Sequence, residues 1–128
     1  MSVKDMMSIL VVDDTSVSRG LIIASLEEIG FKKIDFAKDG ASALDKASRQ
    51  PTHLIISDHN MPGMSGLELL AKLRSQRATA KVGFVLISGT MTPQLIADAK
   101  KTGVNNILAK PFDTAKIRAC LKPIVGPV

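Results

Sequence analysis

The sequence predicts an α/β fold in which a parallel sheet is covered by crossover helices, and two observations support this prediction. Short apolar runs of strand length alternate along the chain with segments of helical period, and turn signals separate them. Polar or charged residues also follow each of the clearest apolar runs, and open α/β sheets bind ligands at the carboxyl ends of their strands. These runs are Ile9–Val12, Leu54–Ser57, Val82–Ile87 and Ile107–Ala109.

The first helix is expected directly after the first of these strands. Thr15 or Ser16 can cap its N-terminus, and Gly30 is suited to end it in the left-handed conformation. The residues expected on its apolar face are Val17, Leu21, Ala24 and Leu26.

A second strand and a second helix follow. The alternating residues Lys33–Ala37 predict a strand that is less buried than the others. Asp39 and Gly40 give a turn signal, and a helix is expected over Ala41–Ser48, with Pro51 closing it.

The third and fourth helices carry clear start signals. The third begins near Ser65, because Glu68 three residues later completes a capping-box pattern. The fourth begins at Thr92, with Pro93 at the first helical position, and it ends at Gly103. The expected apolar face of the third helix is Leu67, Leu70, Ala71 and Leu73.

The fifth helix is expected over residues 114–122, with Pro123 just beyond it. Cys120 is interpreted as a small core residue of this helix rather than a reactive thiol. The apolar positions at helical spacing are Ile117, Cys120, Leu121 and Ile124.

The length and composition indicate the class of protein. The 128 residues suit a single domain, and we expect one domain over residues 1–128, with a core of about 7–124 and no output domain. No apolar stretch approaches the ~20 residues that span a bilayer. The single cysteine excludes an internal disulfide framework and suits a reducing compartment. We expect a cytoplasmic monomer without membrane contact.

The net charge of +5 comes from scattered lysines and arginines. The chain has no Trp or Tyr and four Phe, so platforms for stacking nucleic-acid bases are scarce and we expect no nucleic-acid partner. The basic excess is steepest late in the chain, where it favours an acidic protein partner. The basic residues expected on that partner surface are Lys100, Lys101 and Lys116.

Five chemically active side chains follow the strand ends. Asp13, Asp14 and Asp58 would converge as three carboxylates, and burying them is unfavourable unless a cation neutralises their charge. An oxygen-rich site of this kind suits Mg²⁺. Ser88 and Lys110 would then be placed to meet phosphoryl oxygens as a hydrogen-bond donor and a positive charge.

These segments resemble the receiver domains of two-component response regulators, and most closely the single-domain chemotaxis regulators of the CheY type. The resemblance covers about residues 7–124 and implies a flavodoxin-like (βα)5 fold with strand order 2-1-3-4-5. The segments that carry it are Asp13-Asp14, Ser57 to Gly66, Ser88-Gly89-Thr90 and Lys110-Pro111-Phe112.

The resemblance also implies a role for each site residue. Asp58 would accept a phosphoryl group from a sensor histidine kinase, with Asp14 and Asp58 binding Mg²⁺ directly and Asp13 through a water. The Asn60 backbone carbonyl would complete the metal ligands. Lys110 would meet the phosphoryl group, and its bond to Pro111 would be cis.

The same resemblance implies an output. Ser88 would act as the switch hydroxyl, changing the surface formed by the fourth helix, last strand and fifth helix for a partner such as the flagellar motor switch. A phosphatase is a further implied partner. The protein would catalyse its own phosphorylation and dephosphorylation without turning over an external substrate.

One position departs from the CheY-type pattern. Ile107 stands where an aromatic switch residue usually lies, three positions before Lys110. It is therefore either a switch residue with an aliphatic side chain or a plain strand core residue. A phosphate sink, and an adaptor in cell-cycle or stress signalling, remain alternatives to a motor-binding regulator.

The sequence also bears on two other functional classes. An aspartyl-nucleophile phosphatase commonly needs a second acid, two residues after the nucleophile, to protonate the leaving group. Asn60 occupies that position after Asp58 and cannot supply the proton. A docking module that ignores phosphorylation is compatible with the departure at Ile107. It predicts equal partner affinity for Asp58→Asn and for the protein loaded with beryllofluoride.

Overall fold

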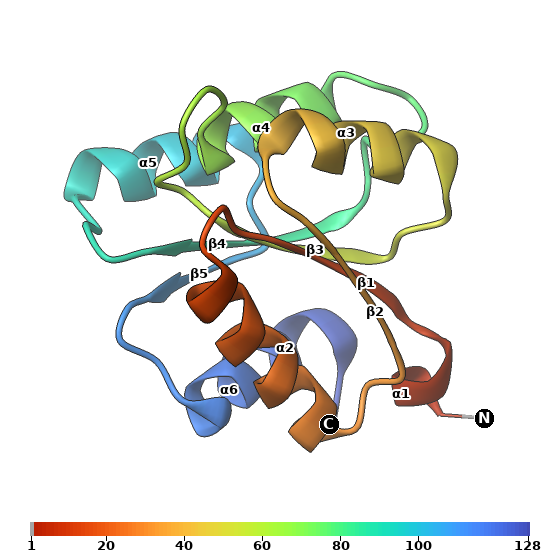
Figure 1. Ribbon diagram of the computed structural model, residues 1–128. Helices are drawn as coiled ribbons and strands as arrows, with labels where there is room; N and C mark the ends of the chain where they lie inside the picture. Colours follow the sequence, from red (N-terminus) through yellow and green to blue (C-terminus); the bar gives the residue numbers. More distant parts are fainter. Residues whose placement is uncertain (1) are drawn as a thin grey trace.

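The computed structural model describes residues 2–128 and has a five-stranded parallel sheet at its centre (Figure 1). The order in the sheet is β2-β1-β3-β4-β5, which confirms the expected order. The register is continuous, with Val11 opposite Ile56 and Ile56 opposite Val85. The strands are β1 (Ser8–Val12), β2 (Lys33–Ala37), β3 (Leu54–Asp58), β4 (Gly83–Ser88) and β5 (Asn106–Ala109).

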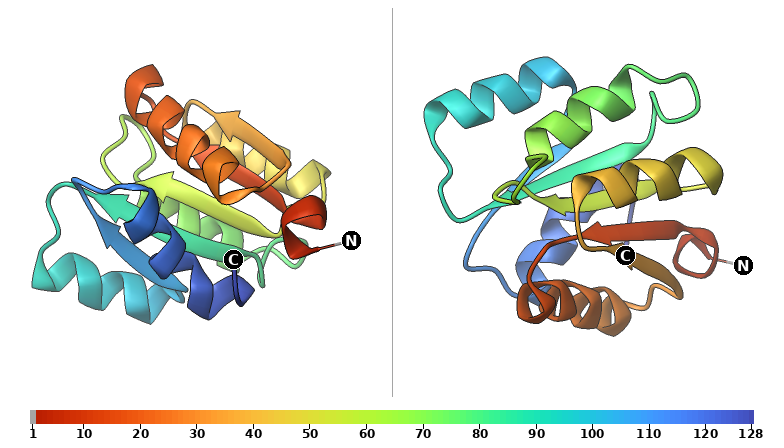
Figure 2. Two further views of the ribbon diagram at one scale, coloured as in Figure 1. Left: turned by 90° about the horizontal axis from the view of Figure 1, so that it is seen from below. Right: turned by 45° about the horizontal axis from the view of Figure 1, so that its top comes forward.

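Helices cover both faces of this sheet. Figures 1 and 2 show α3, α4 and α5 on one face and α2 and α6 on the other, with α1 beside the start of β1. Among the described residues, no helix is long and apolar enough to cross a membrane. The helices are α1 (Val3–Met6), α2 (Ser16–Ile29), α3 (Gly40–Arg49), α4 (Gly66–Arg74), α5 (Pro93–Thr102) and α6 (Thr114–Val125).

The central strands are apolar throughout because both of their faces are buried. Along β1, Leu10 and Val12 pack into the cluster beneath α3, α4 and α5, whereas Ile9 and Val11 pack against α2 and α6. Side chains of a strand alternate between the two faces of a sheet, so a strand covered on both sides reads as a continuous apolar run.

The predicted helix ends are confirmed where the chain has clear capping residues. Ser65 and Glu68 form the capping box that starts α4, and Thr92 caps α5 ahead of Pro93. Gly30 and Gly103 end α2 and α5 with φ of 117° and 97°, a conformation that glycine adopts without steric cost.

The expected apolar face of α2 was wrong for three of its four residues, whereas the burial expected for Leu26 is confirmed. Val17 and Leu21 are 73% and 59% exposed, and Ala24 is exposed as well. The helix has two adjacent rows of apolar residues, and sequence alone does not say which row meets the sheet. The residues that are buried are Ile22, Ser25, Leu26 and Ile29.

Two further expectations need correction, and one short helix had no expectation at all. In α4, Ala71 is exposed and Leu69 is buried instead. Helix α6 does not end at Lys122 but continues through Pro123. Proline so near a helix end removes one backbone hydrogen bond, and the Gly126 N–H still donates to the Lys122 carbonyl at 2.9 Å. The short helix α1 was not predicted.

At Phe36, the side chains of Asp35 and Lys46 cover the backbone on the free edge of β2. Its N–H donates to Asp35 Oδ1 at 2.7 Å, and its carbonyl accepts from Lys46 Nζ at 2.6 Å. Lys46 Nζ also lies 3.2 Å from Asp35 Oδ1. The backbone groups that face away from β1 at this residue are therefore already hydrogen-bonded.

Candidate functional site

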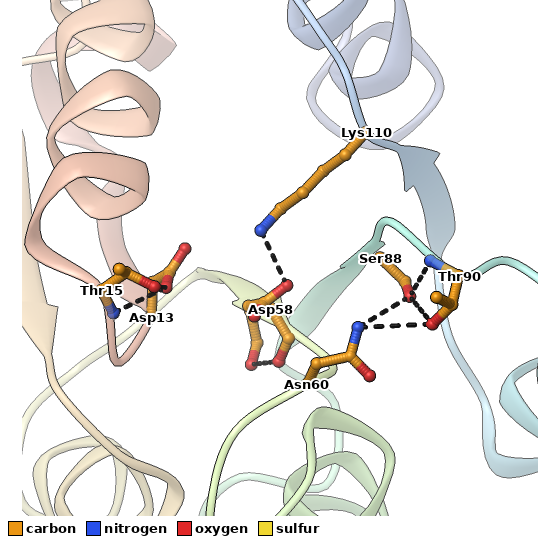
Figure 3. A network of polar contacts seen from close by, with 8 residues as sticks. Asp13, Thr15, Asp58, Asn60, Ser88, Thr90 and Lys110 are labelled. Carbon is orange, nitrogen blue, oxygen red and sulfur yellow. Dashed lines mark hydrogen bonds and ion pairs between the residues drawn. The ribbon is translucent and has the colours of Figure 1, made fainter.

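Four neighbouring strands bring the predicted site residues together at one end of the sheet (Figure 3). Asp13 follows β1, Asp58 ends β3, Ser88 ends β4 and Lys110 follows β5. Parallel strands have their carboxyl ends at the same edge, so these residues converge although nearly a hundred positions separate the first from the last.

The three carboxylates form a close cluster. Oxygen atoms of Asp13, Asp14 and Asp58 all lie within 4.8 Å of one another. Asp13 is buried, Asp58 is 4% exposed and Asp14 is exposed. Burial raises the pKa of the Asp58 carboxyl above 3.8, the Lys110 ammonium opposes this shift, and the charges of Asp13 and Asp14 add to it.

The free oxygen atoms of the cluster suit a divalent cation. Asp13 Oδ1 accepts from the Thr15 N–H at 3.0 Å and from Thr15 Oγ1 at 3.2 Å, but the buried Asp13 Oδ2 has no hydrogen-bond partner. Asp58 Oδ1 is likewise buried without a hydrogen bond, and Lys110 Nζ lies 3.2 Å away as an ion pair. Of these two buried oxygens, only Asp13 Oδ2 has neither a hydrogen bond nor an ion pair, and carboxylate oxygens are ligands that Mg²⁺ prefers. The residues present therefore fit that ion.

Hydroxyl and amide groups line the β4 side of the site. Ser88 Oγ accepts from the Thr90 N–H at 3.1 Å and lies 3.3 Å from Thr90 Oγ1 (Figure 3). The Asn60 amide nitrogen is 3.4 Å from each of these hydroxyl oxygens. Ser88 is thus tied to its own loop and to the loop that follows Asp58.

Lys110 directly follows the edge strand β5, and its side chain extends toward the carboxylate cluster. The Lys110–Pro111 peptide bond is cis, as the sequence resemblance implied. Lys110 N–H donates to the Ser88 carbonyl at 3.0 Å, which fixes the turn after β5 to the end of β4. The ammonium then points toward Asp58 (Figure 3).

Gly66 allows α4 to approach the loop that carries Asp58. Its N–H donates to the His59 carbonyl at 3.0 Å. A Cβ at this position would lie 2.5 Å from the Asp58 carbonyl oxygen and 2.9 Å from the His59 Cα. No side chain fits there without moving the backbone of the site.

We expect Gly66→Ala to destabilise the protein by about 1–3 kcal/mol and to disturb the site, because the added methyl group displaces the Asp58 backbone. Urea denaturation and amide NMR shifts of Asp58 and His59 measure these effects. Gly20→Ala on α2 is the control: a Cβ there meets nothing within 4 Å, and alanine should stabilise the helix by about 0.5–1 kcal/mol. Equal effects of the two substitutions would contradict this prediction.

The sequence pattern of the response regulator receiver domain matches residues 9–122. The chain belongs to this family. A receiver domain is a component of two-component signalling and takes its signal from a histidine kinase. Receiver domains bind Mg²⁺ at an acidic pocket, and the cluster of Asp13, Asp14 and Asp58 is compatible with that.

Individual relatives support the CheY type. The "Probable chemotaxis protein CheY" of Rhizobium etli is 37% identical and covers 98% of this chain and 98% of its own. The structure of Vibrio cholerae CheY4 matches with a TM-score of 0.86 at 29% identity, over 93% of this chain and 98% of that one. The receiver domain of the Pseudomonas aeruginosa sensor histidine kinase PA1611 matches with a TM-score of 0.84 at 27% identity, over 94% and 98%. That structure has a magnesium ion coordinated in the active site cleft.

Two of the residues expected on the partner surface line one groove of the structure. Lys100 and Ile107 line one groove of about 410 Å³ between α5 and β5, whereas Lys101 and Lys116 do not line it. Ile107 is partly buried and packs against the core. The other residues that line this groove are Met91, Ile96, Val104, Asn105, Asn106 and Ala109.

Sequence reasoning missed two residues that support the site. Thr15 was considered only as a helix cap, but its N–H and hydroxyl group hold Asp13. Arg19 Nη1 donates to the Asp13 carbonyl at 3.0 Å and had no signal beyond its place one turn into the helix. Contacts to a backbone carbonyl leave no mark in a single sequence.

Proposed function

We propose that the protein stores a phosphoryl group on Asp58 and signals through the change that this causes on its own surface. The observation that supports this most strongly is the pair of buried carboxylate oxygens without hydrogen bonds, Asp13 Oδ2 and Asp58 Oδ1, beside the Lys110 ammonium. A nucleophile, a cation site and a fixed positive charge are what phosphoryl transfer to a carboxylate requires.

In the proposed reaction, an Asp58 carboxylate oxygen attacks the phosphorus of a phosphohistidine on the kinase. The phosphorus–nitrogen bond breaks, an acyl phosphate forms, and the released histidine nitrogen takes up a proton. Bound Mg²⁺ would neutralise charge on the carboxylates and the phosphoryl oxygens. Asp14, Asp58 and the Asn60 carbonyl would hold it directly, and Asp13 through a water.

Lys110 and Ser88 would receive the phosphoryl oxygens. Lys110 already lies 3.2 Å from Asp58 Oδ1, so its ammonium can stabilise the charge that the phosphoryl group adds. Ser88 Oγ would exchange its contacts with Thr90 and Asn60 for a hydrogen bond to a phosphoryl oxygen. Because the Thr90 N–H also donates to Ser88 Oγ at 3.1 Å and can keep this hydrogen bond, the loop from β4 to α5 would move with Ser88.

This movement would change the shape of the groove between α5 and β5. Met91 belongs to the moving loop and lines the groove together with Ile107 and Lys100. We propose an acidic protein segment as the partner, either on the flagellar motor switch or on another protein, with Lys100, Lys101 and Lys116 attracting it. The aliphatic Ile107 would contribute apolar contact without the hydrogen bond of an aromatic hydroxyl.

The test is phosphorylation with acetyl phosphate and Mg²⁺, followed by mass spectrometry of the intact protein and of its peptides. We expect one phosphoryl group on Asp58, lost when Mg²⁺ is chelated beforehand. Asp45→Asn, which removes an exposed carboxylate on α3, is the matched control and should leave the reaction unchanged. Labelling at another residue, or labelling that is independent of Mg²⁺, would refute the proposal.

The partner surface is tested separately by capturing proteins from the source cells on beryllofluoride-loaded and unloaded protein. A partner held only by the loaded form supports the switch, and Lys100→Glu should weaken it and reduce its salt dependence. Equal capture in both states would favour a docking module that ignores phosphorylation. An absence of loaded-state partners would favour a phosphate sink.

A further inference from the structure

Arg19 and Phe36 make a stacked contact next to the proposed metal site. The guanidinium carbon of Arg19 lies 4.7 Å from the centre of the Phe36 ring, within the range of a cation–π interaction. The same guanidinium donates from Nη1 to the Asp13 carbonyl at 3.0 Å. Phe36 therefore contacts a side chain that holds one of the three clustered aspartates.

The Phe36 ring is itself held in place although it is 41% exposed. Lys46 Nζ lies 5.5 Å from the ring centre and donates to the Phe36 carbonyl at 2.6 Å. Asp35 accepts the Phe36 N–H at 2.7 Å. Exposing a large aromatic ring to water is unfavourable. The two cationic side chains that contact this ring, Arg19 and Lys46, come from helices on opposite faces of the sheet. This arrangement makes the ring a fixed support for Arg19.

These contacts account for the polar atoms of Asp13. Its N–H donates to the Ala37 carbonyl at 3.2 Å, its carbonyl accepts from Arg19, and Oδ1 accepts from Thr15. Only Oδ2 has no partner. Ala37 is the neighbour of Phe36, so the end of β2 supports Asp13 both directly and through Arg19.

We propose that Arg19 and Phe36 are positioning residues that hold Asp13 so that Oδ2 is already aimed at the proposed Mg²⁺ site, where it would accept from a metal-bound water, before the cation arrives. This inference rests on the proposed Mg²⁺ site. Residues behind a metal ligand commonly change metal affinity by ~10–100-fold, because they fix the orientation of the ligand.

The positive charge of Arg19 should weaken Mg²⁺ binding, whereas its contact with Asp13 should strengthen it. Because the two effects have opposite signs, variants can separate them. As a cation near the cluster, Arg19 repels Mg²⁺, so a purely electrostatic role predicts tighter binding when it is removed. A positioning role predicts weaker Mg²⁺ binding when the contacts of Arg19 are lost and its charge is kept. Phe36→Leu and Arg19→Lys both keep the charge near the cluster.

The experiment measures the Mg²⁺ dissociation constant of the full chain by calorimetry, together with its thermal stability. We expect binding to weaken by about threefold in Phe36→Leu and by about tenfold in Arg19→Lys. Phe36→Tyr keeps the aromatic ring and should bind Mg²⁺ as the wild type does. Leu21→Ala is the control, since it changes an exposed residue of the same helix.

Two results would overturn the inference, and a third would refute the metal site on which it rests. Unchanged Mg²⁺ affinity with lower thermal stability in Phe36→Leu would show a structural role alone. Tighter binding in Arg19→Ala with no effect of Phe36→Leu would show a role of charge alone. Mg²⁺ affinity that stays at the wild-type value in both Asp14→Asn and Asp58→Asn would instead refute the proposed metal site itself, and this separates the two failures.

Discussion

Asp58→Asn is expected to abolish phosphorylation and, in the absence of Mg²⁺, to stabilise the protein by about 1–2 kcal/mol. The amide cannot form an acyl phosphate. It also removes a charge that is 4% exposed and lies within 4.8 Å of oxygens of two other carboxylates. The Lys110 ammonium is left without its partner but is partly exposed, so water can solvate it. Acetyl phosphate labelling and urea denaturation in chelator measure the two effects.

The stabilisation should depend on pH with a defined sign. The folded protein raises the pKa of Asp58 above 3.8, mainly by burial, so the folded state keeps this proton to higher pH than the unfolded state does. The stability of the wild type relative to Asp58→Asn is therefore greatest below pH 3.8, and it falls as the pH rises through the folded pKa. At neutral pH the full advantage of the asparagine variant is present.

Mg²⁺ should reverse this order, because a ligand that binds only the folded state stabilises it. Saturating Mg²⁺ is expected to stabilise the wild type more than Asp58→Asn. The exposed carboxylate of Asp45 provides the control, and Asp45→Asn should change stability by less than about 0.5 kcal/mol at any pH. A wild type that is more stable than Asp58→Asn in chelator would contradict the prediction.

Arg74→Met is expected to cost about 2–4 kcal/mol, the largest loss of stability that we predict for a side chain outside the site. The Arg74 guanidinium donates to the Gly103 carbonyl at 3.2 and 2.9 Å, to the Ala80 carbonyl at 3.2 Å and to the Val82 carbonyl at 2.6 Å. It also donates to Asn105 Oδ1 at 3.1 Å. Methionine fills a similar volume but removes the guanidinium donors from the Gly103, Ala80 and Val82 carbonyls, whereas Asn105 Oδ1 still accepts from the Phe84 N–H at 2.8 Å.

Arg49→Met is the matched control for this prediction. Arg49 lies near the end of α3 and forms an exposed ion pair with Asp45 at 2.9 Å, one helical turn away. Exposed pairs of this kind contribute about 0.3–0.5 kcal/mol, so its loss should be close to undetectable. Urea denaturation of both variants decides the matter. Similar small losses in the two would show that the carbonyl contacts of Arg74 contribute little.

The sheet and the chemical site could be predicted from sequence because their signals are local. The buried strands are continuous apolar runs, and the residues that follow them carry the carboxylates, the hydroxyl group and the lysine. Parallel pairing then places the strand ends side by side without any further information. Each strand end in the structure lies within one residue of the expected end: β2 matches at both ends, and β4 is shifted by one residue at each end, to Gly83–Ser88.

The supporting contacts could not be predicted because they depend on which helix face meets the sheet. Val17 and Leu21 were expected in the core together with Leu26, yet α2 presents Ile22 and Ile29 to the sheet beside Leu26 and leaves Val17 and Leu21 exposed. Arg74 gives no sequence signal at all, since its partners are backbone carbonyls and one amide oxygen from other segments. The packing of the finished fold selects such contacts.

The covered edge of β2 has a consequence for the behaviour of the protein at high concentration. A second molecule that tried to extend the sheet at Phe36 would have to displace the Lys46 ammonium from the carbonyl and the Asp35 carboxylate from the N–H. It would also meet two opposite charges at the point of contact. Edge strands with free backbone groups are where intermolecular sheets and fibrils start. At this residue, the side chains of one molecule already occupy the positions that a growing fibril would need.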